Sequence, residues 1–161
     1  MVRAPELHGS GGWIGSEPLT LAALRGRVVL LDFWTLACIN CLRVVEELRA
    51  LERRFPELVV IGIHSPKFPH EHRHEAVRAA VARHRIGHPV LDDPDRRLWD
   101  AYAVRAWPTL VLVDPDGRIA LTRSGEGHTV DLAAAIETLR ETQGSDPSVS
   151  PGALAAASPA S

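Results

Sequence analysis

Cys38 and Cys41 are the only cysteines of the chain, and they form the tetrapeptide Cys-Ile-Asn-Cys. They follow an apolar segment rich in β-forming residues and open a segment with helical periodicity. The unpaired backbone N–H groups and the dipole at a helix start favour a thiolate over a thiol, so Cys38 is predicted to be a nucleophile. Cys41 lies one helical turn further on, where its sulfur can meet that of Cys38. A nucleophilic thiol beside a resolving thiol is what thiol–disulfide exchange requires.

Two other uses of the cysteine pair remain open. A zinc site usually has four protein ligands, so histidines would have to supply the missing ones. His70 and His74 would share one face of a helix, but no carboxylate or cysteine is placed to complete a recognised site, and we predict no metal. The other use is a purely structural disulfide, which would stabilise the fold little because the loop it closes is so short.

The pattern of apolar residues predicts the elements that position the cysteines. Residues 28–34 and 59–63 are nearly continuous apolar runs, as expected of strands covered on both faces. Spacings of three and four predict an amphipathic helix over 39–55, which Pro56 ends. The other expected elements are a short strand and a helical turn within 18–24, a helix over 71–85, a strand at 90–91, a helical piece through 98–102, a hairpin with strands at 110–113 and 118–123, and a helix over 129–142.

This order of elements predicts an α/β fold with a mixed central sheet. A length of 161 residues is enough for one core without disulfide bonds. Residues 144–161 carry one charge and consist mainly of Gly, Ser, Pro and Ala, so they are predicted to be a flexible tail or linker. We therefore place one domain at 1–143.

The composition argues against several classes of function. Lys and Arg total 18 and Asp and Glu total 20, a formal net charge of −2, so the basic surplus of a nucleic-acid-binding protein is missing. No apolar run approaches the ~18–20 residues that cross a bilayer, and no membrane association is predicted. Residues 1–6 lack the apolar segment of a secretory signal, so the expected location is cytoplasmic. Lys67 is the only lysine, and the surplus of arginine and alanine is typical of a GC-rich bacterial genome.

Residues 28–41, VVLLDFWTLACINC, resemble the thioredoxin-like fold in its TlpA/ResA branch, where a strand ending in Asp-Phe-Trp leads into the redox helix. Ala106-Trp107-Pro108-Thr109 is similar to the segment of that fold that carries a cis proline. Further motifs resemble the thioredoxin-like domain of the NHL-repeat-containing protein two family and its bacterial relatives: Gly-Ile-His-Ser at 62–65, Lys-Phe-Pro at 67–69, His-Pro-Val at 88–90, Leu-Trp at 98–99 and Gly-Glu-Gly-His at 125–128.

The resemblance covers about residues 13–140. It implies a thioredoxin-like three-layer sandwich, with helices on both sides of the sheet, and a thiol–disulfide oxidoreductase that needs no bound cofactor. The expected substrates are disulfides or thiols of proteins or small molecules. In that family a β-propeller of NHL repeats follows, so the resemblance implies a propeller in the same or another chain as a partner.

The resemblance also implies roles for single residues. Asp32 matches the family's buried acid, and a raised pKa would let its carboxylate exchange a proton with Cys41. The alternative is a polar core residue whose hydrogen bonds are satisfied. No lysine stands in the strand at 59–63 to partner Asp32, and His64 is the nearest candidate replacement.

Four residues are predicted to form the substrate-binding surface. Pro108, if cis, would bring the backbone of Ala106 and Trp107 beside the sulfurs, where it can pair with an extended substrate. The alternative is an ordinary trans proline at the start of an edge strand. Trp34 and Trp107 are expected to form an apolar rim around the cysteines, with a place in the core as the alternative.

Two rival functions remain. One is a non-catalytic interaction module that keeps the fold to bind a propeller or another partner. The other is peroxide reduction, because Thr35-x-x-Cys38 is similar to part of the peroxiredoxin signature, although the proline of that signature would fall at Leu31. An exposed, easily alkylated Cys38 favours the oxidoreductase, and a buried one favours the module.

Overall fold

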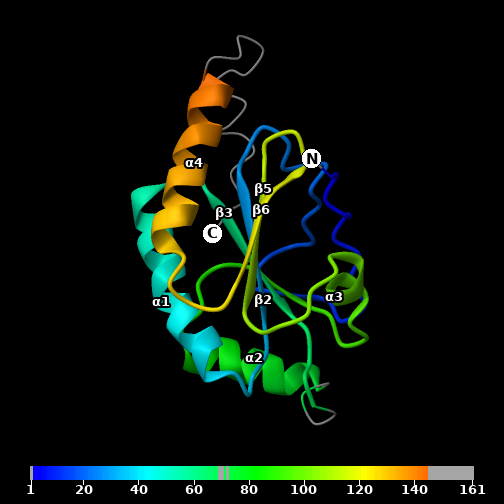
Figure 1. Cartoon of the computed structure of the whole chain (residues 1–161). Helices are drawn as coiled ribbons and strands as arrows, with labels where there is room; N and C mark the ends of the chain where they lie inside the picture. The colour runs from blue at the N-terminus through cyan, green and yellow to red at the C-terminus, as the bar shows by residue number, and fades with distance from the viewer. Residues whose placement is uncertain (1, 69–70, 72, 145–161) are drawn as a thin grey trace.

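A six-stranded mixed sheet runs through the centre of the molecule in the computed structural model, which describes residues 2–68, 71 and 73–144 (Figure 1). The strand order is β1-β4-β3-β2-β5-β6. The central strands β2, β3 and β4 are parallel, whereas β1, β5 and β6 join the sheet antiparallel. The strands are β1 (Trp13–Ile14), β2 (Val29–Trp34), β3 (Val59–His64), β4 (Val90–Asp92), β5 (Thr109–Val113) and β6 (Ile119–Ser124).

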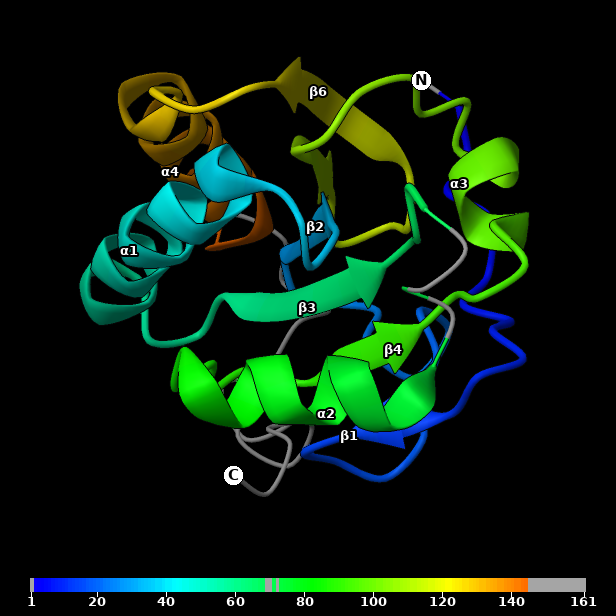
Figure 2. The ribbon, with the colours of Figure 1, turned by 90° about the horizontal axis from the view of Figure 1, so that it is seen from below.

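Helices cover the sheet on both sides, as the view along it shows (Figure 2). α1, α4 and α2 lie on one face, and α3 lies on the other together with the N-terminal segment. This arrangement confirms the predicted thioredoxin-like sandwich. The helices are α1 (Ile39–Arg54), α2 (His74–Arg83), α3 (Arg97–Ala101) and α4 (Thr129–Gly144).

The alternation of side chains along β2 explains why this strand is apolar throughout. Leu30 packs with residues of α1 and α4, whereas Leu31 and Phe33 pack with α3 and the N-terminal segment. Successive side chains of a strand point to opposite faces, so Asp32 lies on the same face as Leu30 and Trp34. The sequence therefore directs the one carboxylate of β2 toward α1, the helix that begins after Cys38.

Two predicted elements differ in the structure. Residues 18–20 have no regular structure and 21–24 form a turn, so the strand of this region is β1, which pairs with β4 at the edge of the sheet. α2 is shorter than predicted, because Arg85 adopts a left-handed backbone (φ 52°) that a helix cannot continue through. Glu71, expected in that helix, lies before it as a buried residue.

The predicted tail begins at residue 144, but α4 includes Gly144. The rest of that tail, 145–161, lies outside the described residues. Within the described ranges, no helix has the length and apolar character needed to cross a membrane.

Candidate functional site

Cys38 caps the N-terminus of α1. Its backbone is extended (φ −102°, ψ 108°), and its sulfur accepts a hydrogen bond from the backbone N–H of Cys41 at 3.2 Å. The sulfur thus takes the place where a serine or aspartate oxygen usually caps a helix. The first turn of α1 contains no acidic residue, so no side chain there offsets the positive end of the helix dipole.

Cys41 lies inside the protein. Its side chain is 1% exposed and packs in a cluster with Trp34 and Val45. Burial raises the pKa of the Cys41 thiol far above its ordinary value, and the sulfur of Cys38 and the carboxylate of Asp32 raise that pKa further. Cys41 is therefore a neutral thiol in the reduced protein and needs a proton acceptor before it can attack.

Asp32 lies in the middle of the sheet, between Gly62 of β3 and Leu110 of β5. Its side chain is 1% exposed, and its Oδ1 atom has no hydrogen-bond partner in the described part of the chain. Burial raises the pKa of Asp32 from its ordinary 3.8 to about 7, although the nearby His88 acts in the opposite direction. This carboxyl group can therefore gain or lose a proton near neutral pH.

Asp32 has a second titratable neighbour besides Cys41, His88, for which the sequence predicts no such role. Opposite Asp32, β3 has Gly62, and a Cβ built there would lie 3.2 Å from the Trp34 indole nitrogen and 3.3 Å from Nε2 of His88. The missing side chain makes room for the buried His88 ring. His64, the candidate named from the sequence, instead accepts a hydrogen bond from Leu36 N–H at 3.3 Å and faces Asp92. The one sequence signal for His88 was its place in the His-Pro-Val motif.

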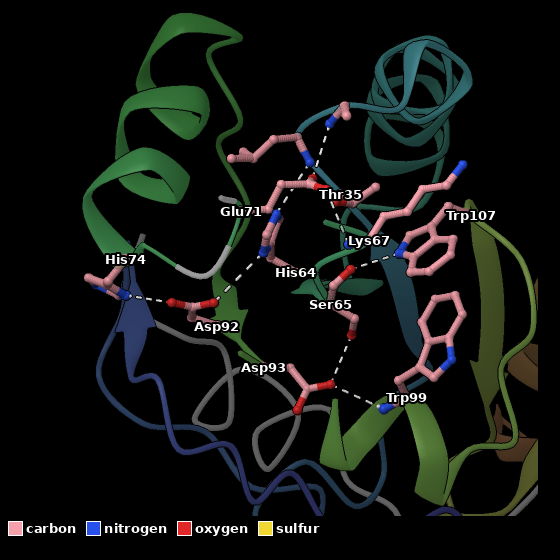
Figure 3. A network of polar contacts seen from close by, with 12 residues as sticks. Thr35, His64, Ser65, Lys67, Glu71, His74, Asp92, Asp93, Trp99 and Trp107 are labelled. Atoms are coloured by element: carbon pink, nitrogen blue, oxygen red, sulfur yellow. Dashed lines mark hydrogen bonds and ion pairs between the residues drawn. The ribbon is translucent and has the colours of Figure 1, made fainter. Parts of the chain in front are cut away.

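An open pocket of about 520 Å³ lies beside Cys38. Trp107 forms one wall: its indole N–H donates to the Ser65 carbonyl at 2.7 Å, and its ring stacks on Trp99 at 3.9 Å (Figure 3). Trp107 precedes Pro108, and the peptide bond between them is cis. The pocket is lined by Ala37, Cys38, Ile39, Asn40, Lys67, Arg105, Ala106 and Trp107.

The predicted substrate-binding residues divide between this pocket and the core. Ala106 and Trp107 line the pocket, and Pro108 is buried next to them in sequence. Trp34 does not line it, which corrects the expected rim: its side chain is 3% exposed and packs edge-on against the His64 ring. The physical reason is that Trp34 points to the α1 face of the sheet, where α1 and α2 cover it.

The backbone near the pocket offers fewer free groups than expected. The Ala106 carbonyl already accepts a hydrogen bond from the Thr109 hydroxyl at 2.7 Å. No hydrogen bond of the Trp107 backbone N–H or carbonyl occurs among the described residues. Trp107 thus has both of its backbone groups available to an extended substrate.

A buried carboxylate, Glu71, joins the two loops beside the pocket (Figure 3). One oxygen accepts hydrogen bonds from the Thr35 hydroxyl and from Ala37 N–H, and the other accepts from the N–H groups of Lys67 and Phe68. Burial acts to raise the pKa of Glu71, but these hydrogen bonds outweigh it and keep the pKa below its ordinary value. Glu71 is therefore charged at neutral pH and fixes the backbone just before Cys38. The sequence alone placed it in a helix and missed this function.

A second group of polar side chains, His64, His74 and Asp92, lies beside the segment before Cys38, where His64 accepts the Leu36 N–H. Nδ1 of His74 and one oxygen of Asp92 are joined by a hydrogen bond at 2.8 Å, and the other oxygen of Asp92 lies 3.7 Å from Nδ1 of His64. Among the residues that the structure describes, no three His, Cys, Asp or Glu side chains gather as a metal site would require. His70, considered as a ligand from the sequence, is outside these residues.

Comparison with known proteins assigns this geometry to a family. A family model described as thioredoxin-like matches residues 26–119, more than half of the chain. NHL repeat-containing protein 2 of Gallus gallus is 43% identical over 133 residues, which cover 80% of this chain and 18% of that protein. The thiol-disulfide oxidoreductase YkuV of Bacillus subtilis is 23% identical over 75% of this chain and 82% of its own length.

A solved structure agrees with the assignment. The crystal structure of the thioredoxin-like superfamily protein SPOA0173 superposes with a TM-score of 0.76 and 30% identity, covering 86% of this chain and 96% of that one. The chain spans less than a fifth of the length of the first curated relatives that it matches.

Proposed function

The chain belongs to the thioredoxin-like family, and from this membership we propose that it is a thiol–disulfide oxidoreductase in which Cys38 attacks and Cys41 resolves. One observation carries the proposal. Cys38 caps the N-terminus of α1 on the wall of an open pocket, whereas Cys41, one turn further on, is buried and donates its N–H to the Cys38 sulfur. This is the arrangement that two successive attacks require, the first from outside and the second from within.

The first step uses the sulfur that the pocket exposes. The Cys38 thiolate attacks one sulfur of a substrate disulfide, a Cys38–substrate bond forms, and the substrate's own S–S bond breaks. The second substrate sulfur leaves as a thiolate and takes a proton from water. The free backbone groups of Trp107 hold the substrate chain in an extended form beside Cys38.

The second step needs the buried acid. The Asp32 carboxylate accepts the proton of the Cys41 thiol, and the resulting thiolate attacks the Cys38 sulfur. A Cys38–Cys41 disulfide forms and the substrate sulfur leaves as a thiolate, so two electrons pass from the protein to the substrate. The proposal for Asp32 is supported by its pKa of about 7 and by its effect on the pKa of Cys41. The two cysteines carry the electrons, and no bound cofactor takes part.

Substituting the resolving cysteine tests this order of events. Reduced Cys41→Ser is mixed with a peptide disulfide, and the product is mapped by mass spectrometry under non-reducing conditions. A mixed disulfide through Cys38 is expected to accumulate. The matched control, Cys38→Ser, should form little adduct because Cys41 is buried. An equal or greater adduct at Cys41 would reverse the proposed roles.

Two other functions predict different results in experiments on this protein. A non-catalytic module that binds an NHL-repeat propeller is suggested by the name of the chicken relative, and it predicts that Cys41→Ser traps no disulfide at all. Peroxide reduction predicts a sulfenic acid on Cys38 after mild peroxide treatment. The Thr35 hydroxyl donates to Glu71 and is thus engaged away from a peroxide, which favours disulfide exchange.

A further inference from the structure

The pocket beside Cys38 has a cationic rim. Lys67 and Arg105 line it, and the charged groups of Lys67 and Arg96 lie 5.9 Å and 5.3 Å from the centre of the Trp107 ring. Within the part of the chain that the structure describes, none of these three side chains forms an ion pair with a carboxylate. Lys67 is also the only lysine of a chain whose formal net charge is −2. The positive charge is therefore a local property of this surface.

Acidic groups near the pocket do not cancel this charge. Glu71 is buried, and its two oxygens are occupied by the hydroxyl and N–H groups of the loops that it joins. Glu126, in the loop that bonds to Pro108, pairs with Arg43 at 3.2 Å. The positive end of the α1 dipole, which has no acidic residue in its first turn, adds to the cations. An incoming anionic segment thus meets positive groups in the pocket beside Cys38 that no carboxylate of the described residues pairs with.

The same surface offers apolar contact and backbone groups. Ile39, directly after Cys38, is 70% exposed, and Phe68, directly after Lys67, is 44% exposed. Trp107 contributes a half-buried ring and its backbone N–H and carbonyl. Exposed apolar side chains around a reactive group indicate a surface that binds a partner. A peptide segment can contact all of these groups at once, whereas a small disulfide would reach only some of them.

We infer that the substrate of this site is a disulfide within an acidic polypeptide segment, whose carboxylates pair with Lys67 and Arg105 while its cysteine meets Cys38. This inference rests on the proposed function and specifies its substrate. Charge complementarity of this kind acts mainly on the rate of association and weakens as salt screens it.

A pair of model peptides measures this preference. Peptides that differ only in Asp or Lys beside one cysteine are prepared as mixed disulfides with thiopyridine, a neutral leaving group. The Cys38 thiolate of reduced Cys41→Ser attacks the peptide sulfur, the Cys38–peptide bond forms, the peptide–thiopyridine bond breaks, and released thiopyridone is followed by absorbance. The acidic peptide is expected to react about tenfold faster than the basic one at low salt. High salt should bring the ratio close to one.

Charge reversal identifies the residues responsible. In the Cys41→Ser background, Lys67→Glu with Arg105→Glu should reverse the preference. Arg78→Glu is the matched control, because Arg78 is exposed on α2, does not line the pocket, and should leave the ratio unchanged. A peptide with neutral neighbours normalises each variant, so that damage to the fold is separated from a change in preference.

Each outcome distinguishes the inference from the function beneath it. Equal rates for the acidic and basic peptides at low salt overturn the inference of an acidic substrate and leave the proposed oxidoreductase function intact. The same conclusion follows if Arg78→Glu changes the rate ratio as much as Lys67→Glu with Arg105→Glu does. Glutathione carried on the same leaving group and reacting as fast as the acidic peptide overturns the assignment to a polypeptide. Failure of every peptide to react at Cys38 overturns the proposed function itself.

Discussion

Replacing Asp32 by asparagine is expected to stabilise the reduced protein at neutral and alkaline pH while slowing its chemistry. Asp32 lies in the sheet without a hydrogen bond to Oδ1, and burial raises its pKa from 3.8 to about 7. In the unfolded chain this carboxyl group is charged above pH 3.8, whereas in the folded protein it stays neutral up to about pH 7. The stability that the neutral group contributes is therefore present at low pH and is lost as the pH rises through 7.

The size of this loss follows from the two pKa values. A difference of about three units corresponds to about 4 kcal/mol at high pH, at about 1.4 kcal/mol per unit. Most of this loss of stability, about 2.5 kcal/mol, develops between pH 5 and pH 8. The amide that replaces the carboxyl group cannot ionise, so the free energy of unfolding of Asp32→Asn should exceed that of the wild type by an amount that grows over this range.

Urea unfolding of both proteins with reductant present, at several pH values from 5 to 8, measures the difference. Asp114→Asn is the matched control, since Asp114 is also a buried carboxylate but lies at the turn between β5 and β6. A difference between Asp32→Asn and wild type that does not change with pH would refute the raised pKa. A gain of the same size in Asp114→Asn would show that the effect is not specific to Asp32. Loss of the proton acceptor should also slow the attack of Cys41 about 10²-fold, seen as a longer-lived mixed disulfide.

Three further substitutions test the surroundings of the cysteines by urea unfolding. Glu71→Gln should lower the free energy of unfolding by about 2 kcal/mol at neutral pH, because buried N–H donors lose a charged acceptor. Folding lowers the pKa of Glu71, so this difference from the wild type should shrink as the pH falls. A difference that stays constant with pH would contradict the lowered pKa. Gly62→Ala should cost about 1–3 kcal/mol, as its Cβ meets Trp34 and His88, and an unchanged stability would mean that the space beside Asp32 is not filled. Trp107→Phe should lower the free energy of unfolding by about 1 kcal/mol through loss of the hydrogen bond to Ser65 and should slow exchange with peptide disulfides; an unaffected rate would remove the Trp107 side chain, though not its backbone, from substrate binding.

The sequence predicts the parts of the site that local patterns determine. The amphipathic spacing after Cys41 predicts α1, which begins at Ile39, directly after the first cysteine. The nearly continuous apolar run around Asp32 predicts a strand covered on both faces, and β2 is fully buried. The fold class follows from the order of such elements, because strands and helices that alternate must form layers.

The sequence does not predict the contacts between residues far apart in the chain. Glu71 lies 36 positions from Thr35, and nothing in its charged surroundings distinguishes it from an exposed helix residue. The His88 ring occupies space that Gly62, opposite Asp32 on the neighbouring strand, leaves open. Trp34 is the last residue of the buried strand β2. Its aromatic side chain suggests a place on the rim of the pocket, but α1 and α2 cover it and keep it in the core. Pairings of this kind depend on sheet register and helix packing.

The central claim is that Cys38 and Cys41 exchange a disulfide with a substrate. The most direct measurement mixes the fully reduced protein with one equivalent of a peptide disulfide, quenches with acid, and maps both species by mass spectrometry. We predict a Cys38–Cys41 bond in the protein together with one fully reduced peptide for each bond formed. A folded protein that keeps both thiols while the peptide stays oxidised, with Cys38 still open to alkylation, would contradict the claim.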